Sequence, residues 1–197
     1  WTVDAKHAAA TFADIERGLD LALSDRIFSR DGSPLEVVVA NDLLKQNATI
    51  AAAESCTGGL FAERLTTIAG SSAYFLGGVV CYSNEMKTAW ADVPQEMIAT
   101  KGAVSTEVAI ALAEGIRRRV GSTLGVGITG VAGPSGGSEE KPVGTVHIAL
   151  ANATGVRERA LRLPGDREMV RLQASQAALD MVRVHFLYNG QTPPKRP

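Results

Sequence analysis

The sequence predicts an α/β protein, a three-layer α/β/α sandwich with a mixed, mostly parallel sheet of about five strands. Short apolar segments typical of buried strands alternate with longer segments in which apolar residues recur at helical spacing. Such alternation is typical of a sheet that carries helices on both faces. Near the end of the chain, two strand-like segments flank the turn at residues 152–155, which predicts an antiparallel pair and excludes a purely parallel sheet.

The strands are predicted from apolar runs bounded by glycine, proline or polar turn residues. We expect them at residues 49–53, 74–82, 124–129, 143–150 and 156–163. The segment 74–82 is apolar over most of its length, which predicts a buried strand.

The helices are predicted from apolar residues spaced three and four apart. The first helix of the sandwich starts at Leu35, and Val38, Val39 and Leu43 continue its apolar face. Ser105 is expected to cap a longer helix, because serine is favoured at the N-cap position. The remaining helices are expected at residues 59–68, at 94–100 and from 166 onward.

The chain is predicted to contain one folded domain with extensions at both ends. Residues 1–34 are mostly polar with a loose helical pattern, and they end in the turn signal Asp-Gly-Ser-Pro. We interpret them as a linker or as the tail of a missing N-terminal domain. Residues 35–188 form the predicted domain, and residues 189–197 are expected to be a disordered tail.

Composition excludes several classes of protein. The formal net charge is −1 and no long run of lysine or arginine occurs, so we expect neither a nucleic-acid partner nor a membrane partner. The apolar runs are shorter than the ~20 residues of a membrane-spanning helix. The two cysteines, Cys56 and Cys81, are too few for a disulfide scaffold and favour a reducing, cytoplasmic location. The three histidines lack metal-ligand spacing, so no metal site is expected.

The stretch Ala51–Gly59, AAAESCTGG, predicts a strand that turns sharply into a helix. A hydroxyl at such a corner lies at the carboxyl edge of the sheet, where open α/β folds bind their ligands. Ser55 is therefore a candidate nucleophile. The alternative is that Ser55 or Thr57 caps the helix, because both residue types are common caps.

A second polar cluster, Tyr82–Lys87, follows another expected strand, and a third begins at Thr129 with the glycine-rich loop 130–142. Lys87 is a candidate base for Ser55, as in Ser-Lys variants of the catalytic triad. This role requires a lowered pKa, and the alternative is an ordinary surface lysine on a short helix. Tyr82 and Asn84 are expected to orient Lys87 or to hold the substrate; their alternative roles are a core aromatic and an N-cap. His147, the only histidine on an expected core strand, falls in mid-strand, and we expect it to be a packed or edge residue; the alternative is that it is the base for Ser55.

Several motifs in this order resemble those of the CinA C-terminal domain family, the competence/damage-inducible proteins that include nicotinamide mononucleotide deamidase. The resemblance covers residues 35–188. The motifs are AESCTGG at 53–59, YSNEMK at 82–87, GAVS at 102–105, GITGVAGP at 127–134, GGSEEKPVGT at 136–145 and PGDR at 164–167.

The resemblance implies hydrolysis of the carboxamide of nicotinamide mononucleotide to nicotinic acid mononucleotide and ammonia, without a cofactor. Amide N–H groups at residues 56–58 are expected to stabilise an oxyanion. The loop after Thr129, or an arginine or lysine, is expected to hold the phosphate. By position, the implied catalytic residues are Ser55, Lys87 and Tyr82. The implied substrate-binding residues are Glu54, Cys56, Thr57, Gly58, Asn84, Ser105, Thr129, Gly130 and Gly133.

Two other functions remain open at this point. The domain could bind a nucleotide without turnover and regulate the missing N-terminal domain, because a pocket can persist on a fold without its chemistry. Alternatively, Cys56 is the nucleophile, since a helix N-terminus lowers the pKa of a thiol. A homodimer is expected, as for most enzymes of this size.

Overall fold

The computed structural model describes residues 4–191, and only the backbone of residues 5 and 6. The chain divides into two units between Pro34 and Leu35. The first unit contains helix α1 (Ala5–Leu23) and a 3₁₀ helix, η1 (Ser24–Arg26). The second unit contains the sheet and the other helices. Of the tail expected at 189–197, residues 189–191 form a turn after the last helix, and residues 192–197 lie outside the described part.

A five-stranded sheet in the order β2-β1-β3-β4-β5 forms the centre of the second unit. The strands are β1 (Ile50–Glu54), β2 (Phe75–Val80), β3 (Leu124–Gly130), β4 (Thr145–Ala151) and β5 (Val156–Arg162). The helices are α2 (Leu35–Lys45), α3 (Leu60–Thr66), α4 (Asn84–Ala91), α5 (Gln95–Lys101), α6 (Thr106–Val120) and α7 (Arg167–Leu187), with a 3₁₀ helix, η2 (Ser71–Ala73).

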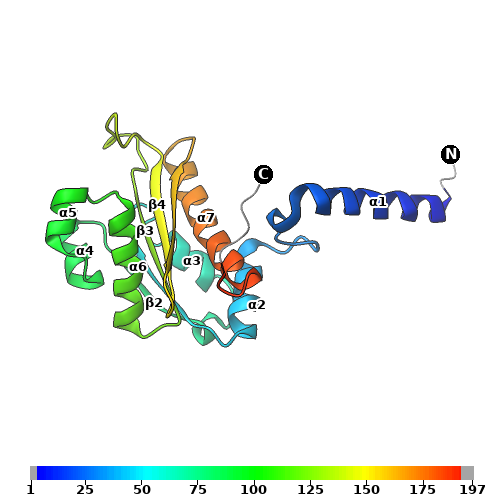
Figure 1. Cartoon of the computed structure of the whole chain (residues 1–197), viewed down its shortest axis with the longest axis horizontal. Coiled ribbons are helices and arrows are strands. Elements are labelled where there is room, and N and C mark those ends of the chain that lie inside the picture. The colour runs from blue at the N-terminus through cyan, green and yellow to red at the C-terminus, as the bar shows by residue number, and fades with distance from the viewer. Residues whose placement is uncertain (1–3, 192–197) are drawn as a thin grey trace. The chain divides into compact units, whose positions relative to one another are not determined.

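The sheet is mixed, as predicted. Strand β1 pairs in parallel with β2 and with β3, and β4 is antiparallel to both β3 and β5. Four of the five strands therefore run in one direction, and β4 alone opposes them. Helices α2, α3 and α7 cover one face and α4, α5 and α6 cover the other, so the three-layer α/β/α sandwich is confirmed (Figure 1).

Close packing of α6 on the centre of the sheet explains the glycines of β3. A Cβ atom on Gly125 would lie 2.2 Å from the carbonyl oxygen of Ala113, and one on Gly127 would lie 2.3 Å from that of Ala109. Both carbonyls belong to α6, so only glycine allows the helix backbone this close to the strand. This contact places the N-terminus of α6 beside the carboxyl end of β3.

Strand β2 differs from the prediction of a buried strand. It pairs only with β1 and so forms one edge of the sheet, where its side chains alternate between half-buried and exposed. Leu76 and Val80 are 46% and 47% exposed. The apolar run indicated burial because hydrophobicity alone does not distinguish an edge strand from a central one.

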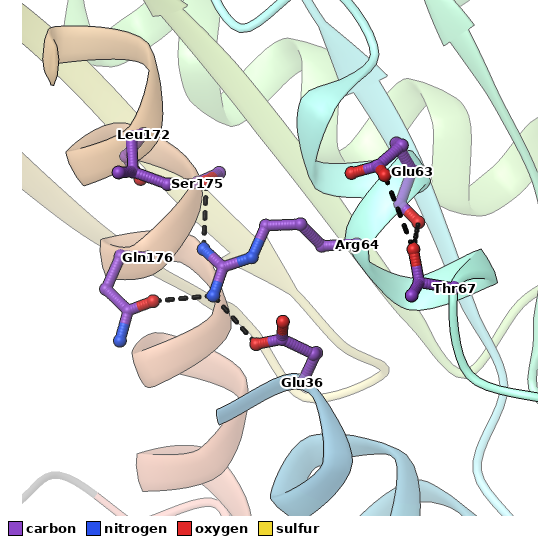
Figure 2. A network of polar contacts seen from close by, with 7 residues as sticks. All are labelled: Glu36, Glu63, Arg64, Thr67, Leu172, Ser175 and Gln176. Carbon is purple, nitrogen blue, oxygen red and sulfur yellow. Dashed lines mark hydrogen bonds and ion pairs between the residues drawn. The ribbon is translucent and has the colours of Figure 1, made fainter. Parts of the chain in front are cut away.

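A polar network joins three helices on one face of the sheet (Figure 2). The guanidinium of Arg64 on α3 donates hydrogen bonds to Glu36 of α2 and to Ser175 and Gln176 of α7, at 2.8, 3.0 and 2.6 Å. The Arg64 and Glu36 side chains are only 12% and 21% exposed, so water screens this ion pair weakly. The network fixes α7 against the helix that follows β1.

No helix in the described part of the chain combines the length and apolar character needed to cross a membrane.

Candidate active site

A pocket of about 200 Å³ lies where β1, β2 and β3 end. Because these strands are parallel, their carboxyl ends meet at one edge of the sheet, and the three polar clusters that follow them meet there. The pocket is lined by Ser55, Cys56, Tyr82, Asn84, Lys87, Ala103, Val104, Thr129, Gly130, Ala132 and Arg167.

Ser55 is the first residue after β1. Its N–H donates to the carbonyl of Ile128 at 2.9 Å and extends the pairing with β3 by one residue. The residue is 8% exposed, and its hydroxyl forms no hydrogen bond within residues 4–191. The alternative of a capping residue is wrong, because Gly59, at φ 95°, is the N-cap of α3 and no side chain caps the helix from that position.

Glu54 does not line the pocket, in contrast to the prediction that it binds substrate. Its carboxylate lies at the N-terminus of α3 and accepts hydrogen bonds from the N–H groups of Gly59, Phe61 and Ala62 at 3.0, 3.1 and 2.9 Å. The side chain is 1% exposed. A carboxylate is favourable there because the first N–H groups of a helix lack partners and carry partial positive charge. The anion site expected at this corner is therefore filled by the protein itself.

Lys87 lies on the first turn of α4 and is 2% exposed, so the alternative of a surface lysine is wrong. Its Nζ donates to the carbonyl oxygens of Cys81 and Tyr82 at 3.0 and 3.2 Å. Burial lowers the pKa of Lys87, and interactions with Cys81, Cys56 and Glu85 oppose part of this shift. Burial acts in this direction because it disfavours the charged ammonium.

Ser55 and Lys87 line the same pocket without a direct hydrogen bond between them. A neutral amine has two N–H bonds, and the carbonyls of Cys81 and Tyr82 accept one each. The lone pair then occupies a remaining tetrahedral position on Nζ. An uncharged Lys87 is thus free to accept a proton inside the pocket.

Arg167 is a pocket residue that the sequence did not identify. It is the first residue of α7, and its guanidinium donates to the hydroxyl of Tyr82 and to the carbonyl of Gly133, both at 2.9 Å. Tyr82 is 59% exposed, which excludes its alternative role as a core aromatic. The PGDR motif at residues 164–167 was the signal in the sequence that could have identified Arg167. Its aspartate caps α7, which makes the arginine the first residue of that helix.

Asn84, Thr129 and Gly130 line the pocket, as expected from the sequence. Asn84 is the first residue of α4, but the N-cap is Ser83, whose hydroxyl accepts from the N–H of Met86. The hydroxyl of Thr129 donates to the carbonyl of Ala103 at 2.8 Å and so ties β3 to the segment before α6.

Four further residues expected to bind substrate do not line the pocket. Thr57 is fully buried, and its hydroxyl has no partner among the described residues. The N–H of Gly58 donates to the carbonyl of Ser55 at 3.1 Å. Ser105 caps α6 by accepting from the N–H of Val108, as predicted for its structural role. Gly133 contributes its carbonyl to Arg167. These four residues belong to the turns around the pocket. Their spacing along the sequence does not show whether a residue forms such a turn or contacts the ligand.

Cys56 lines the pocket but does not have the lowered pKa expected at a helix N-terminus. It is 5% exposed, and burial raises the pKa of its thiol to about 12. The interaction with the Glu54 carboxylate contributes in the same direction. The corner favours a thiol rather than a thiolate chiefly because burial disfavours the charged form, and the Glu54 carboxylate adds to this effect.

His147 lies on β4 outside the pocket lining, where its Nδ1 is 3.0 Å from the hydroxyl of Thr106. Burial lowers its pKa. Across residues 4–191, no group of three or more histidine, cysteine, aspartate or glutamate side chains is arranged to hold a metal ion.

The chain is similar to known proteins of one family. The CinA C-terminal domain model matches residues 32–186. CinA-like proteins from Koribacter versatilis and Geotalea daltonii are 54% and 52% identical over 178 and 165 residues, which cover 90% and 84% of this chain. The chain spans 43% and 40% of the length of these relatives.

Solved structures of the same kind share the fold. The competence/damage inducible protein CihA from Agrobacterium tumefaciens is 39% identical with a TM-score of 0.76, covering 82% of this chain and 98% of that one. A CinA superfamily protein from Klebsiella pneumoniae is 32% identical with a TM-score of 0.76, covering 78% and 96%. The family model covers every strand of the sheet and the pocket, and the chain therefore belongs to the CinA C-terminal domain family.

Proposed function

We propose that this domain is an amidohydrolase that converts nicotinamide mononucleotide to nicotinic acid mononucleotide and ammonia, with Ser55 as the nucleophile and Lys87 as its base. The observation that carries the proposal is the buried amine of Lys87, with its lowered pKa, in the same pocket as the unpartnered hydroxyl of Ser55. A serine becomes a nucleophile when an adjacent base takes its proton, and a desolvated lysine can be that base.

The reaction follows in two halves. Lys87 takes the proton of the Ser55 hydroxyl as the serine oxygen attacks the amide carbon, and a tetrahedral oxyanion forms. The ammonium of Lys87 then returns the proton to the amide nitrogen, which leaves as ammonia while Ser55 remains acylated. Water attacks the ester and Lys87 takes one of its protons. The carboxylic acid product leaves as this proton passes to the Ser55 oxygen, and the acid then releases its own proton to solvent.

Backbone N–H groups beside Ser55 are the natural donors to the oxyanion. The N–H of Gly58 already donates to the carbonyl of Ser55, which leaves the N–H groups of Cys56 and Thr57 as the candidates from the corner. Donors of this kind stabilise the developing charge without reorganising during the reaction.

Arg167 is the candidate for the phosphate. It is the one cation besides Lys87 in the described lining of the pocket. Guanidinium groups suit phosphate because they donate two parallel hydrogen bonds. The helix N-terminus of α3 is unavailable for this role because Glu54 occupies it.

The test is ammonia release from nicotinamide mononucleotide, with the nucleotide product identified by chromatography. Ser55→Ala and Lys87→Met should each lower kcat by at least about a thousandfold with an unchanged fold by circular dichroism. Lys45→Met, at an exposed lysine on α2, is the matched control and should keep full activity. Full activity in either pocket variant would remove the Ser-Lys mechanism.

Calorimetry, combined with the ammonia assay, separates catalysis from binding alone. Calorimetry that gives tight binding of nicotinamide mononucleotide to the wild-type domain, together with no ammonia, would instead support a nucleotide-binding regulatory role.

A further inference from the structure

We propose that Arg171 is a positioning residue for the Ser55 corner and acts through the carbonyl of Thr57. The inference rests on the proposed role of Ser55 as a nucleophile. Arg171 lies on α7, which is far from the corner in the sequence, and it does not line the pocket.

The contact between Arg171 and the corner consists of two hydrogen bonds to one acceptor. Both Nε and Nη2 of Arg171 donate to the carbonyl oxygen of Thr57, at 3.1 and 2.8 Å. The same oxygen accepts weakly from the N–H of Leu60 at 3.4 Å. Charge-assisted hydrogen bonds that share one acceptor fix its position more firmly than a neutral bond does.

The carbonyl of Thr57 belongs to the peptide plane that also contains the N–H of Gly58. This N–H donates to the carbonyl of Ser55 at 3.1 Å, while the N–H of Ser55 donates to Ile128 of β3. Because a peptide group is planar, fixing the Thr57 oxygen toward α7 directs the Gly58 N–H back toward Ser55. Arg171 therefore determines the orientation of the peptide group that holds Ser55 in place.

Glycine at position 58 leaves this corner dependent on outside contacts. Gly58 has a φ of 62°, and glycine restricts the backbone less than any other residue. An ideal Cβ on Gly58 would lie 3.6 Å from Nη2 of Arg171, so the guanidinium packs directly over the turn. Arg167 and Arg171 are one helical turn apart, and together they connect α7 to the loops after β1, β2 and β3.

The experiment compares Arg171→Gln with Arg64→Gln. Arg64 also spans from the α3 region to α7 through a multiple hydrogen-bond network, but it does not line the pocket or contact the Ser55 corner (Figure 2). Both substitutions remove a guanidinium that holds α7, so both should lower Tm. Only Arg171→Gln should impair chemistry, with kcat lowered about tenfold to a hundredfold and KM within about twofold, because displacement of a nucleophile by ~1 Å has effects of this size.

Two more measurements test the positioning role of Arg171. The first does not require the proposed substrate, and the second separates loss of the hydrogen bond from a general effect on folding. The rate at which a sulfonyl fluoride modifies Ser55, followed by peptide mass spectrometry, should fall by about tenfold or more in Arg171→Gln and stay within about twofold in Arg64→Gln. Arg171→Lys, which can still donate to Thr57, should recover part of both rates.

The outcomes distinguish failure of the proposed substrate from failure of the positioning role. Arg171-dependent modification of Ser55 without ammonia release from nicotinamide mononucleotide would overturn the proposed substrate and support the positioning role. Wild-type rates in a folded Arg171→Gln protein, or equal losses in Arg171→Gln and Arg64→Gln, would overturn the positioning role. A wild-type protein in which Ser55 is not modified between pH 7 and pH 9 would overturn both.

Discussion

The guanidinium of Arg167 donates a hydrogen bond of 2.9 Å to the hydroxyl of Tyr82, although the two residues lie 85 positions apart in the chain. The pair connects the start of α7 to the loop after β2 at the edge of the pocket. It places a fixed positive charge beside an exposed aromatic ring.

Replacement of Arg167 should weaken recognition of the phosphate. We expect Arg167→Gln to raise KM for nicotinamide mononucleotide by about 10- to 100-fold and to change kcat much less, because a charged hydrogen-bond partner is lost in both the ground state and the transition state. Nicotinamide riboside, which lacks the phosphate, should show little change in kcat/KM. Steady-state kinetics with both substrates measure the difference, and equal losses on both would contradict a phosphate-binding role.

The activity should depend on pH through Lys87. In the proposed mechanism the uncharged amine is the base, so kcat/KM should rise with pH and level off above the pKa of Lys87, which burial places below the ordinary value of ~10.4. The exposed Glu85 raises this pKa, so Glu85→Gln should move the rising limb to lower pH. A limb that moves to higher pH, or not at all, would argue against Lys87 as the titrating group.

The same shift predicts how stability depends on pH. The pKa of Lys87 is lower in the folded state than in the unfolded chain, so the unfolded chain binds more protons between the two values. The contribution of Lys87 to stability should therefore increase as pH rises through this interval. Thermal unfolding of the wild type and of Lys87→Met across alkaline pH measures this contribution, because the variant should lack the pH-dependent increase in stability.

Treatment with a thiol reagent should leave the proposed activity of the folded domain intact. With a pKa of about 12, only about one Cys56 side chain in ten thousand is ionised at pH 8, and the thiolate is the reactive form. Iodoacetamide at pH 8 should alkylate Cys56 very slowly unless the protein is first unfolded, and Cys56→Ala should retain turnover. Mass spectrometry gives the extent of alkylation; rapid alkylation with parallel loss of ammonia release would restore Cys56 as a candidate nucleophile.

Removal of the Glu54 carboxylate should destabilise the fold. Glu54→Ala would leave three N–H groups at the start of α3 without their acceptor, and we expect the free energy of unfolding to fall by about 2–4 kcal/mol. Glu63→Gln, at an exposed glutamate on the same helix, is the control and should change it by less than about 0.5 kcal/mol. Urea unfolding measures both values. A loss in Glu54→Ala no larger than in the control would show that the carboxylate is not needed as a cap.

The sequence by itself determined the strands and most helices of the sandwich, although not α4, and the corner at Ser55. Apolar runs bounded by turn residues predicted β1, β3 and the antiparallel pair, and the serine before α6 predicted its cap. These features depend on residues close together in the chain. The edge position of β2 was not predictable in this way, because it depends on which strands become neighbours.

Only the tertiary structure decided the environment of each polar side chain. Glu54, Ser55 and Lys87 are all polar residues at or near the carboxyl end of a strand. Among the described residues, however, Glu54 caps a helix, the Ser55 hydroxyl has no partner, and Lys87 is buried against two carbonyls. Arg167 and Arg171 reach the pocket region from the last helix, beyond any local spacing rule. The physical reason is that burial, pKa and hydrogen-bond partners depend on atoms brought together by folding, whereas local patterns carry only the conformation of the backbone.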